Sequence, residues 1–429
     1  MIDGAQYTIL PIKSMSGTIE VAGDRAISHR ALILSAVAQG EGVLTGLNTG
    51  RDCLTTAACM RKLGAKIELD GTAATVRGTK SLKNNQHLYV LGSGTTLRLL
   101  TGLVAGAGVN AYFEDEDAVI GKNLARILES LAAMGARITA VEGCPPIAVK
   151  GETLKGRTIY LGGAGAQVKG ALLLAGLWAK GGITLFEDVP SRDHTEILLE
   201  QMSADLTRDD DGKLTIRPAP LKSIGMHIPG DISCAAYYMV AATILPESDI
   251  VLRALGLNPL RTCVIDVINA CGGRITLMNE AMPRGERVGD VLAQYAPHLR
   301  PFNLTGVLAP HVIDELPALA VMACFTSGVS RITGARELRS RGTDRIALLC
   351  KTLSAMGGAV QELPDGMLIR GTGGLHGGVE VDCQGDYRVA MAMTLAAAAS
   401  ERGAVLVNAS GAQENYPGFF APLERKRQA

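Results

Sequence analysis

The chain has 429 residues, of which 47% are hydrophobic and 20% charged, and its 42 basic residues balance 42 acidic ones. This length predicts two to three domains, each large enough to bury a core. The missing basic surplus argues against nucleic acid or an anionic membrane as the main partner, because both require an excess of Lys and Arg. No run of 18 or more apolar residues occurs, and the N-terminus lacks the order of a signal peptide, so we expect a cytoplasmic protein.

A short β-rich run, a polar or glycine-rich loop and an apolar helix recur in this order along the chain. The copies begin at Thr18, Leu88, Thr158, Gly225, Gly306 and Val379. Their spacing of about 65 to 80 residues exceeds one solenoid turn, so each copy should be a larger supersecondary unit. Six such units predict two domains of three.

A second element lies between the copies, a helix that ends in glycine and is followed by a strand. It reads MRKLGAKIEL, LESLAAMGARITA, INACGGRITL and LSAMGGAVQEL, and the glycine is typical of a helix C-cap. The remaining copy, EQMSADLTR from Glu200, lacks the glycine. Alternating strands and helices throughout the chain predict the α/β class.

The helix entry loops of the first three copies are GDRAISH, GSGTT and GAGAQ. The first N–H groups of a helix have no partner within it, so these loops could bind a phosphate or carboxylate. As isolated strings they are more often simple turns, by about three to one. GSGTT lacks both the P-loop ending and the GxGxxG pattern, which argues against a nucleotide cofactor.

The nine cysteines lie singly between Cys53 and Cys383, without a CxxC pair or a Cys/His group at metal-ligand spacing. We therefore expect buried free thiols and neither a metal nor another cofactor.

Eight segments of the chain together resemble the motifs of one enzyme family. In chain order they are GDRAISHRALIL, GSGTTLRLLTGL, GAQVKGALLLAGL, SRDHTE, GDISCAAYYMVAA, DELPALAVMA, ELRSRGTDRI and DYRVAMAM. They are similar, in the same order, to those of the 5-enolpyruvylshikimate-3-phosphate synthase (3-phosphoshikimate 1-carboxyvinyltransferase) family.

The resemblance implies an α/β enolpyruvyl transferase fold of two domains, each with three βαβαββ repeats around a pseudo-threefold axis. Residues 21–242 would form one domain, and residues 1–20 with 243–429 the other, with hinges near Val21 and Ala242. The helix N-termini would face one cleft that binds small anionic substrates. A monomer is favoured, although the sequence leaves the oligomeric state open.

The family transfers the enolpyruvyl group of phosphoenolpyruvate to a hydroxyl of shikimate 3-phosphate. By resemblance, Arg30 matches the arginine that binds the cyclitol carboxylate, Gln167 a ring contact and Ser191 a phosphate contact. Asp314 matches the base toward the reacting hydroxyl. The acceptor site would also include Arg25 and Glu337.

Two further arginines, Arg345 and Arg388, match the phosphoenolpyruvate site, where a guanidinium fork suits carboxylate or phosphate. Gly94, Thr95 and Lys122 complete this predicted anion site. Without the motifs, Arg345 would more often be a surface side chain.

Three residues inside the motifs have alternative interpretations. Asp314 could instead cap a helix that begins near Leu316. His29 and His194 are expected to orient local backbone rather than act as acid or base.

Several positions depart from the family pattern in the helix entry loops. Arg25 and Ala26 replace the Lys-Ser pair, Gly92 replaces an asparagine, and Gly165 replaces a serine. A cation is thereby kept while hydroxyl groups that contact the ring or the phosphate are lost.

The predicted phosphoenolpyruvate side departs further. Ile120 aligns with an arginine, with Lys122 as the nearby substitute, and Glu414 lies where many relatives carry a lysine. Arg341 and Gly342 replace the lysine and glutamate that shuttle protons, and arginine does not release its proton at working pH. Arg341 remains the candidate for this catalytic position.

Three hypotheses about function follow. The protein is an enolpyruvyl transferase with replacement groups, or it binds a phosphorylated or carboxylated cyclitol and catalyses another reaction, such as elimination of phosphate or water. The third hypothesis is a ligand-binding protein without catalysis.

Overall fold

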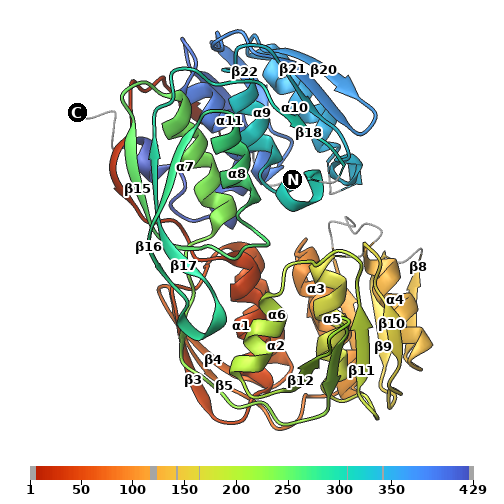
Figure 1. Ribbon diagram of the computed structural model, residues 1–429. Coiled ribbons are helices and arrows are strands. Elements are labelled where there is room, and N and C mark those ends of the chain that lie inside the picture. Colours follow the sequence, from red (N-terminus) through yellow and green to blue (C-terminus); the bar gives the residue numbers. More distant parts are fainter. Residues whose placement is uncertain are drawn as a thin grey trace. The chain divides into compact units, whose positions relative to one another are not determined.

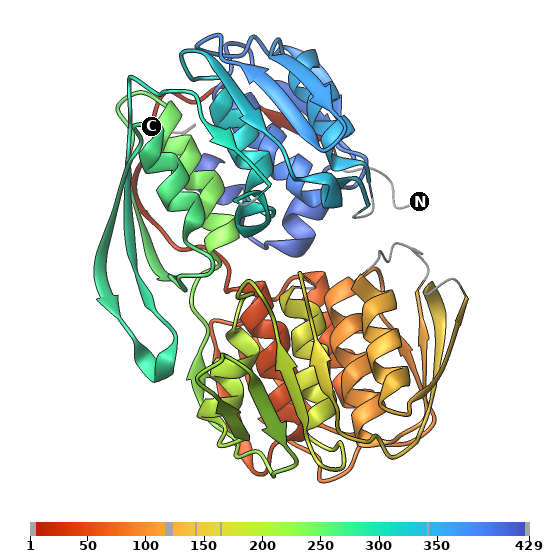
Figure 2. The same ribbon diagram turned by 45° about the vertical axis from the view of Figure 1, so that its right-hand side comes forward.

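The computed structural model describes residues 6–115, 123–141, 144–163, 165–306, 308–340 and 343–424 (Figures 1 and 2). The chain forms two compact units. Unit 1 contains the described residues of Met1–Ala22, Pro229–Pro283 and Arg287–Ala429, and unit 2 contains Gly23–Ile228 and Arg284–Glu286. The first division lies next to the boundary expected near Val21.

The second division differs from the expected boundary at Ala242. That residue lies inside helix α7 (Ile232–Ile244), all of whose residues are buried. The helix packs on strands of unit 1, and the chain therefore changes units earlier, between Ile228 and Pro229.

Unit 2 contains three four-stranded sheets with one common topology, in which the first two strands of each sheet are parallel and the other pairs antiparallel. The strands are, in sheet order, β14 (Met226–His227), β3 (Glu41–Thr45), β5 (Ala73–Arg77), β4 (Lys66–Asp70); β6 (Gln86–Tyr89), β7 (Ala111–Glu114), β9 (Cys144–Lys150), β8 (Arg137–Val141); and β10 (Thr158–Tyr160), β11 (Ile183–Phe186), β13 (Leu214–Arg217), β12 (Asp205–Arg208).

In the part of unit 2 that the structure describes, six helices accompany these sheets: α1 (Arg25–Val37), α2 (Arg51–Lys62), α3 (Gly94–Ala107), α4 (Asn123–Ala133), α5 (Ala166–Gly176) and α6 (His194–Gln201). Helices α3 and α5 approach so closely that a Cβ atom on Gly102 or Gly106 would collide with the backbone of Ala171 or Ala175. This approach explains why glycine occupies both positions, and it brings the first turns of the two helices together.

Unit 1 repeats the same topology in three further sheets, the last of which has three strands among the described residues. The strands are, in sheet order, β2 (Ser16–Ile19), β15 (Asp249–Gly256), β17 (Val288–Gln294), β16 (Arg274–Ala281); β18 (Asn303–Leu304), β19 (Val329–Ile332), β21 (Gly366–Arg370), β20 (Ala359–Leu363); and β22 (Val379–Asp382), β23 (Ala404–Val407), β1 (Tyr7–Ile9).

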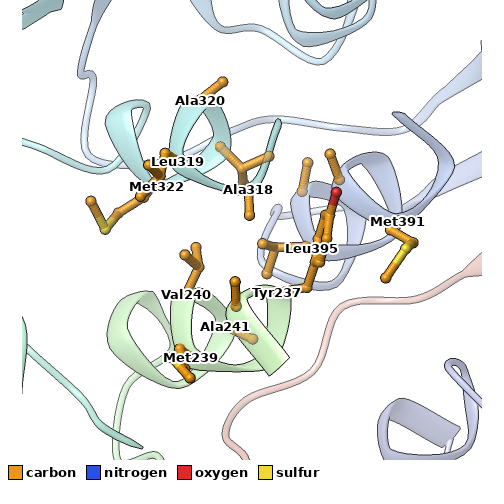
Figure 3. Packing of buried hydrophobic residues seen from close by; sticks show 14 of the residues in the cluster. Tyr237, Met239, Val240, Ala241, Ala318, Leu319, Ala320, Met322, Met391 and Leu395 are labelled. Carbon is orange, nitrogen blue, oxygen red and sulfur yellow. The ribbon is translucent and has the colours of Figure 1, made fainter. Parts of the chain in front are cut away.

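The core of unit 1 lies between α7, α9 and α11 (Figure 3). Tyr237 and Val240 of α7, Leu319 of α9, and Met391 and Leu395 of α11 are among its buried side chains. The helices that the structure describes in this unit are α7, α8 (Cys263–Ala270), α9 (Leu316–Ala323), α10 (Arg345–Ala355), α11 (Tyr387–Ala398), α12 (Gly411–Asn415) and α13 (Ala421–Glu424), with short turns η2 (Ala309–Val312) and η3 (Arg336–Ser340). The short turn η1 (Pro283–Gly285) begins at the last residue of one segment of unit 1 and continues into the Arg284–Glu286 segment of unit 2.

The helix signals of the sequence correspond to real termini. Asp24, Ser93, Asp231 and Asp386 each cap a helix by accepting a backbone N–H with the side chain. The glycines predicted as C-caps all have positive φ angles, at Gly64, Gly135, Gly272 and Gly357. In the copy that lacks the glycine, Ser203 adopts this conformation instead, with φ of 63°.

All nine cysteines are free thiols, as expected, and seven of them are buried. Within the described ranges, none of the helices has the length and apolar character needed to span a bilayer.

Candidate functional site

Arg30 is the most tightly held of the predicted site residues in unit 2. Its side chain is buried in α1, and its Nε donates to Thr195 Oγ1 at 2.7 Å. The two terminal nitrogens donate to backbone carbonyls, Nη1 to Ala26 at 2.9 Å and Nη2 to Ala166 at 3.3 Å. The guanidinium therefore joins the first turns of α1, α5 and α6, and its orientation is fixed by the fold.

Gln167 lies between the first turns of α5 and α3. Its Oε1 accepts from Arg98 Nη1 at 2.9 Å, and its Nε2 donates to Thr95 Oγ1 at 3.0 Å. The neighbouring Gly94 leaves room for Arg98, because a Cβ on this glycine would lie 2.8 Å from Nη1. Gln167, Thr95 and Gly94, which were predicted from separate motifs, are thus brought together.

A buried ammonium organises the loop that carries Ser191. Lys169 Nζ lies 2.7 Å from Oε1 of both Glu187 and Glu196, and it donates to the Ser191 carbonyl at 3.0 Å. Glu187 also accepts from the Ser191 N–H and hydroxyl, at 3.0 and 2.8 Å. Burial raises the pKa of Glu196 while Lys169 opposes the shift. Both Lys169 and Glu196 have 3% of their side chains exposed, so the loop rests on a nearly dry ion cluster.

Arg25 is more accessible than Arg30. Its Nη1 lies 3.2 Å from Asp52 Oδ2, the side chains of both residues being partly buried. Burial raises the pKa of Asp52, and the charge of Arg25 counteracts this shift. The first turn of α1 thus presents a cation beside a carboxylate.

Both motif histidines bond to side chains, which corrects the expectation that they orient backbone. His29 Nδ1 contacts Thr56 Oγ1 at 2.7 Å, and burial, followed by the charges of Arg25 and Arg30, lowers the pKa of His29 well below its usual value. His194 Nδ1 lies 3.0 Å from Glu286 Oε2. The partners come from other segments of the chain, Thr56 from α2 and Glu286 from the segment after η1, and a local pattern does not reveal them.

The central contact of the predicted site in unit 1 joins Arg388 to Asp314. Arg388 Nη1 donates to the Asp314 carbonyl at 2.8 Å, and its Nη2 lies 3.3 Å from the carboxylate Oδ1. Although burial acts in the opposite direction, Asp314 raises the pKa of Arg388 well above its usual value. Asp314 is not a helix cap: α9 begins at Leu316, and Glu315 occupies the N-cap position, although its side chain does not accept from the first N–H groups of the helix.

Arg345 is held by a second carboxylate in the same unit. Its Nε donates to Asp386 Oδ2 at 2.8 Å, and Thr343 Oγ1 donates to the same oxygen at 2.7 Å. Although burial alone would raise the pKa of Asp386, Arg345 holds it below the usual value. The other oxygen of Asp386 accepts from the Arg388 and Val389 N–H groups at the start of α11. One aspartate therefore ties together the elements that carry both predicted arginines.

A buried polar network adjoins this pair. Arg261 Nη2 donates to Asp231 at 3.3 Å and to Ser233 at 2.8 Å, while Tyr416 Oη donates to Asp231 at 3.1 Å. The Ser233 hydroxyl donates to Glu315, the residue after Asp314. These contacts fix the start of α9, where the predicted base lies.

The remaining predicted residues lie on short helical elements of unit 1 or outside the described ranges. Glu337 is exposed on η3. Glu414 is half-buried in α12. The structure does not describe Lys122 and Arg341, which the sequence analysis placed in the site. It also does not describe Ile120 and Gly342, two of the departures from the family pattern.

The sequence interpretation missed the residues that orient the predicted ones. They are Thr195, Lys169, Glu187, Arg98 and Asp386. Thr195 and Lys169 lie within the SRDHTE and GAQVK motifs, so the motifs themselves were the available signal. The arrangement offers cations and neutral donors for anions, and the described residues contain no cluster of His, Cys, Asp and Glu that could hold a metal ion.

Comparison with known proteins gives consistent matches. Residues 9–423 match the family described as EPSP synthase (3-phosphoshikimate 1-carboxyvinyltransferase). A 3-phosphoshikimate 1-carboxyvinyltransferase from Synechococcus sp. (strain CC9605) is 40% identical over 425 residues, covering 96% of each chain. One from Syntrophotalea carbinolica is 39% identical over 427 residues, covering 98% of each.

Solved structures agree with the sequence matches. EPSP synthase from Acinetobacter baumannii superposes with a TM-score of 0.86 at 32% identity, covering 98% of both chains. The enolpyruvyl transferase NikO from Streptomyces tendae gives a TM-score of 0.80 at 17% identity over 99% of this chain and 98% of that one, which is a likeness of fold alone. The predicted α/β enolpyruvyl transferase fold is confirmed.

Proposed function

Because the chain belongs to the EPSP synthase (3-phosphoshikimate 1-carboxyvinyltransferase) family, we propose that it transfers the enolpyruvyl group of phosphoenolpyruvate to a hydroxyl of shikimate 3-phosphate or a closely related phosphorylated cyclitol. No cofactor takes part in this proposal. The observation that carries it is the contact between Arg388 and Asp314, in which a buried anion-binding guanidinium adjoins a half-buried carboxylate base.

The roles of the side chains follow from their chemistry. Arg30, already oriented by Thr195, binds the acceptor carboxylate, and Gln167 donates to or accepts from the ring hydroxyls. Arg345 and Arg388 hold the carboxylate and phosphate of phosphoenolpyruvate, since a guanidinium fork binds either group with two hydrogen bonds. Each of these groups is held in place before the substrates arrive, which lowers the entropic cost of binding.

Transfer then proceeds by addition and elimination. Asp314 accepts the proton of the acceptor hydroxyl while the oxygen forms a bond to C2 of phosphoenolpyruvate, and it delivers this proton to the methylene carbon, which becomes a methyl group. Asp314 then removes a proton from that methyl group as the C2–O bond to phosphate breaks. The expelled phosphate carries the proton away, so the products are an enolpyruvyl ether and inorganic phosphate. Cations near the phosphate stabilise the charge that develops as it leaves.

A second candidate is elimination of phosphate or water from a bound cyclitol without phosphoenolpyruvate. It is favoured by Gly342, which has no titratable group where relatives carry a glutamate, and by Ile120 in place of an arginine. The acceptor-side residues Arg30, Gln167 and Ser191 would serve either reaction.

Phosphorus NMR with isothermal titration tests the proposal. The purified protein is given shikimate 3-phosphate and phosphoenolpyruvate, alone and together. Transfer predicts inorganic phosphate only when both are present, and heat of phosphoenolpyruvate binding only after the acceptor is added. Phosphate released from shikimate 3-phosphate alone would instead establish elimination. Tight cyclitol binding with unchanged spectra would identify a protein that binds without catalysis.

A further inference from the structure

Three consecutive residues in the first turn of α6 each contact a different part of unit 2. His194 Nδ1 contacts Glu286 Oε2 at 3.0 Å, Thr195 Oγ1 accepts from Arg30 Nε at 2.7 Å, and Glu196 lies 2.7 Å from Lys169 Nζ. All three α6 residues are at most 3% exposed. Two of these contacts lead directly to the groups assigned to the acceptor, because Arg30 is the carboxylate-binding arginine and Lys169 supports Ser191.

Glu286 reaches His194 from a segment far along the chain. It follows the tip of the hairpin between β16 and β17 (Figures 1 and 2), and Arg284–Glu286 belong to unit 2. The tip has two further contacts there. Arg284 Nη1 donates to the Gly225 carbonyl at 2.6 Å, and the Gln201 amide donates to the Arg284 carbonyl.

Two irregularities in the sheet that contains this hairpin share one carboxylate. The register shifts between Leu252 and Leu255 of β15 and between Met278 and Ala281 of β16. Asp290 accepts from Ala254 N at 2.8 Å and from Asn279 Nδ2 at 2.8 Å, and these two donor residues have left-handed φ angles of 49° and 50°. Bulges of this kind redirect a strand at a defined point.

The contact with Glu286 also determines which ring nitrogen of His194 carries the hydrogen. A carboxylate only accepts hydrogen bonds, so its partner Nδ1 carries the hydrogen, and in the neutral ring Nε2 is then the unprotonated nitrogen. His194 Nε2 is buried and has no hydrogen-bond partner among the described residues. Glu286 is thus the side chain that selects the tautomer and the ring orientation of His194.

We propose that Glu286 is a positioning residue for acceptor binding. It holds His194, and through the first turn of α6 it fixes the guanidinium of Arg30 and the ion cluster beneath Ser191. This inference rests on the proposed function for the identity of the ligand, while the geometry of the pair does not depend on it. A buried, oriented partner behind a ligand-contacting group commonly affects affinity without touching the ligand.

The test compares Glu286→Ala with Glu286→Gln, whose amide oxygen still accepts from Nδ1. Arg284→Ala is the matched control, because it removes a contact of the same hairpin tip without touching His194. Shikimate 3-phosphate is titrated into each folded variant by calorimetry, and KM is measured separately for both substrates. We expect Glu286→Ala to weaken shikimate 3-phosphate binding about 10-fold and to leave KM for phosphoenolpyruvate unchanged. Glu286→Gln and Arg284→Ala should remain near the parent value.

A double-mutant cycle identifies the route of the effect. In a His194→Ala background, Glu286→Ala should cause no further loss of affinity, since the two side chains act as one unit. The proposal would be overturned if Glu286→Ala caused the same loss of affinity in the parent and in the His194→Ala background. It would also be overturned if Glu286→Ala left the affinity unchanged, or if Arg284→Ala caused the same loss.

Nitrogen-15 NMR of labelled histidines separates this inference from the proposed function. The parent protein should show His194 with a protonated Nδ1, assigned by its disappearance in His194→Ala, and Glu286→Ala should change that pattern. If the parent did not bind shikimate 3-phosphate, the proposed function would fail, and the spectra would still decide the positioning of His194. An unprotonated Nδ1 in the parent would refute the pairing itself.

Discussion

Replacing Lys169 with methionine should destabilise unit 2, because it removes the ammonium that lies between the buried carboxylate of Glu196 and the half-buried carboxylate of Glu187. At 2.7 Å and an effective dielectric constant near 20, each contact corresponds to about 6 kcal/mol of Coulomb attraction. Burying the ammonium removes it from water, and this cost offsets much of the Coulomb attraction in the parent protein. Breaking a buried ion pair by removing one partner costs about 3 to 5 kcal/mol, and we expect that range here.

The sign of the pH dependence provides a second check. Burial already raises the pKa of Glu196, and without Lys169 it should rise further. A carboxyl whose pKa is raised in the folded state stabilises the protein below its unfolded pKa, and this stability is lost as pH rises through the folded pKa. The Lys169→Met variant should therefore lose more stability at pH 8 than at pH 5, where a proton partly replaces the ammonium.

Urea unfolding at pH 5, 6.5 and 8 measures both effects. Lys213→Met is the matched control, since Lys213 pairs with Asp211 on the surface and its loss should leave the unfolding midpoint unchanged. A loss below about 1 kcal/mol for Lys169→Met, or a larger loss at pH 5 than at pH 8, would refute the account of the buried cluster.

Three further substitutions have defined outcomes. Arg388→Ala should weaken phosphoenolpyruvate binding by about 1.5 to 3 kcal/mol, the scale of a hydrogen bond to a charged group, and an unchanged dissociation constant would remove Arg388 from the site. Thr195→Val should raise KM for shikimate 3-phosphate, because Arg30 loses the acceptor of its Nε, and equal increases in KM for both substrates would count against this role. His29→Asn should make the free energy of unfolding less dependent on pH in the acidic range. Below pH 6.5 the histidine of the unfolded chain binds a proton that the buried histidine does not bind, so the parent loses up to about 1.4 kcal/mol of stability per pH unit. If the free energies of unfolding of parent and variant changed equally between pH 5 and 7, this prediction would be wrong.

The sequence was informative where structure depends on neighbouring residues. The recurring pattern predicted the α/β class and the order of the elements, and Asp24, Ser93 and Asp386 mark helix starts because their side chains accept nearby backbone N–H groups. The motifs identified the family, which the comparisons confirm. The boundary expected near Ala242 from the resemblance differs from the observed division, because the chain there continues through a helix that packs on strands of unit 1.

The amino-acid sequence by itself determined which groups are available, namely the arginines, the carboxylates and the capped helix starts, together with the repeated units that carry them. Only the tertiary structure decided which groups meet. Arg30 and Thr195 are 165 positions apart, His194 and Glu286 are 92 apart, and Arg388 and Asp314 are 74 apart. Such pairs depend on how helices and sheets pack at long range, and local propensity contains no information about that packing.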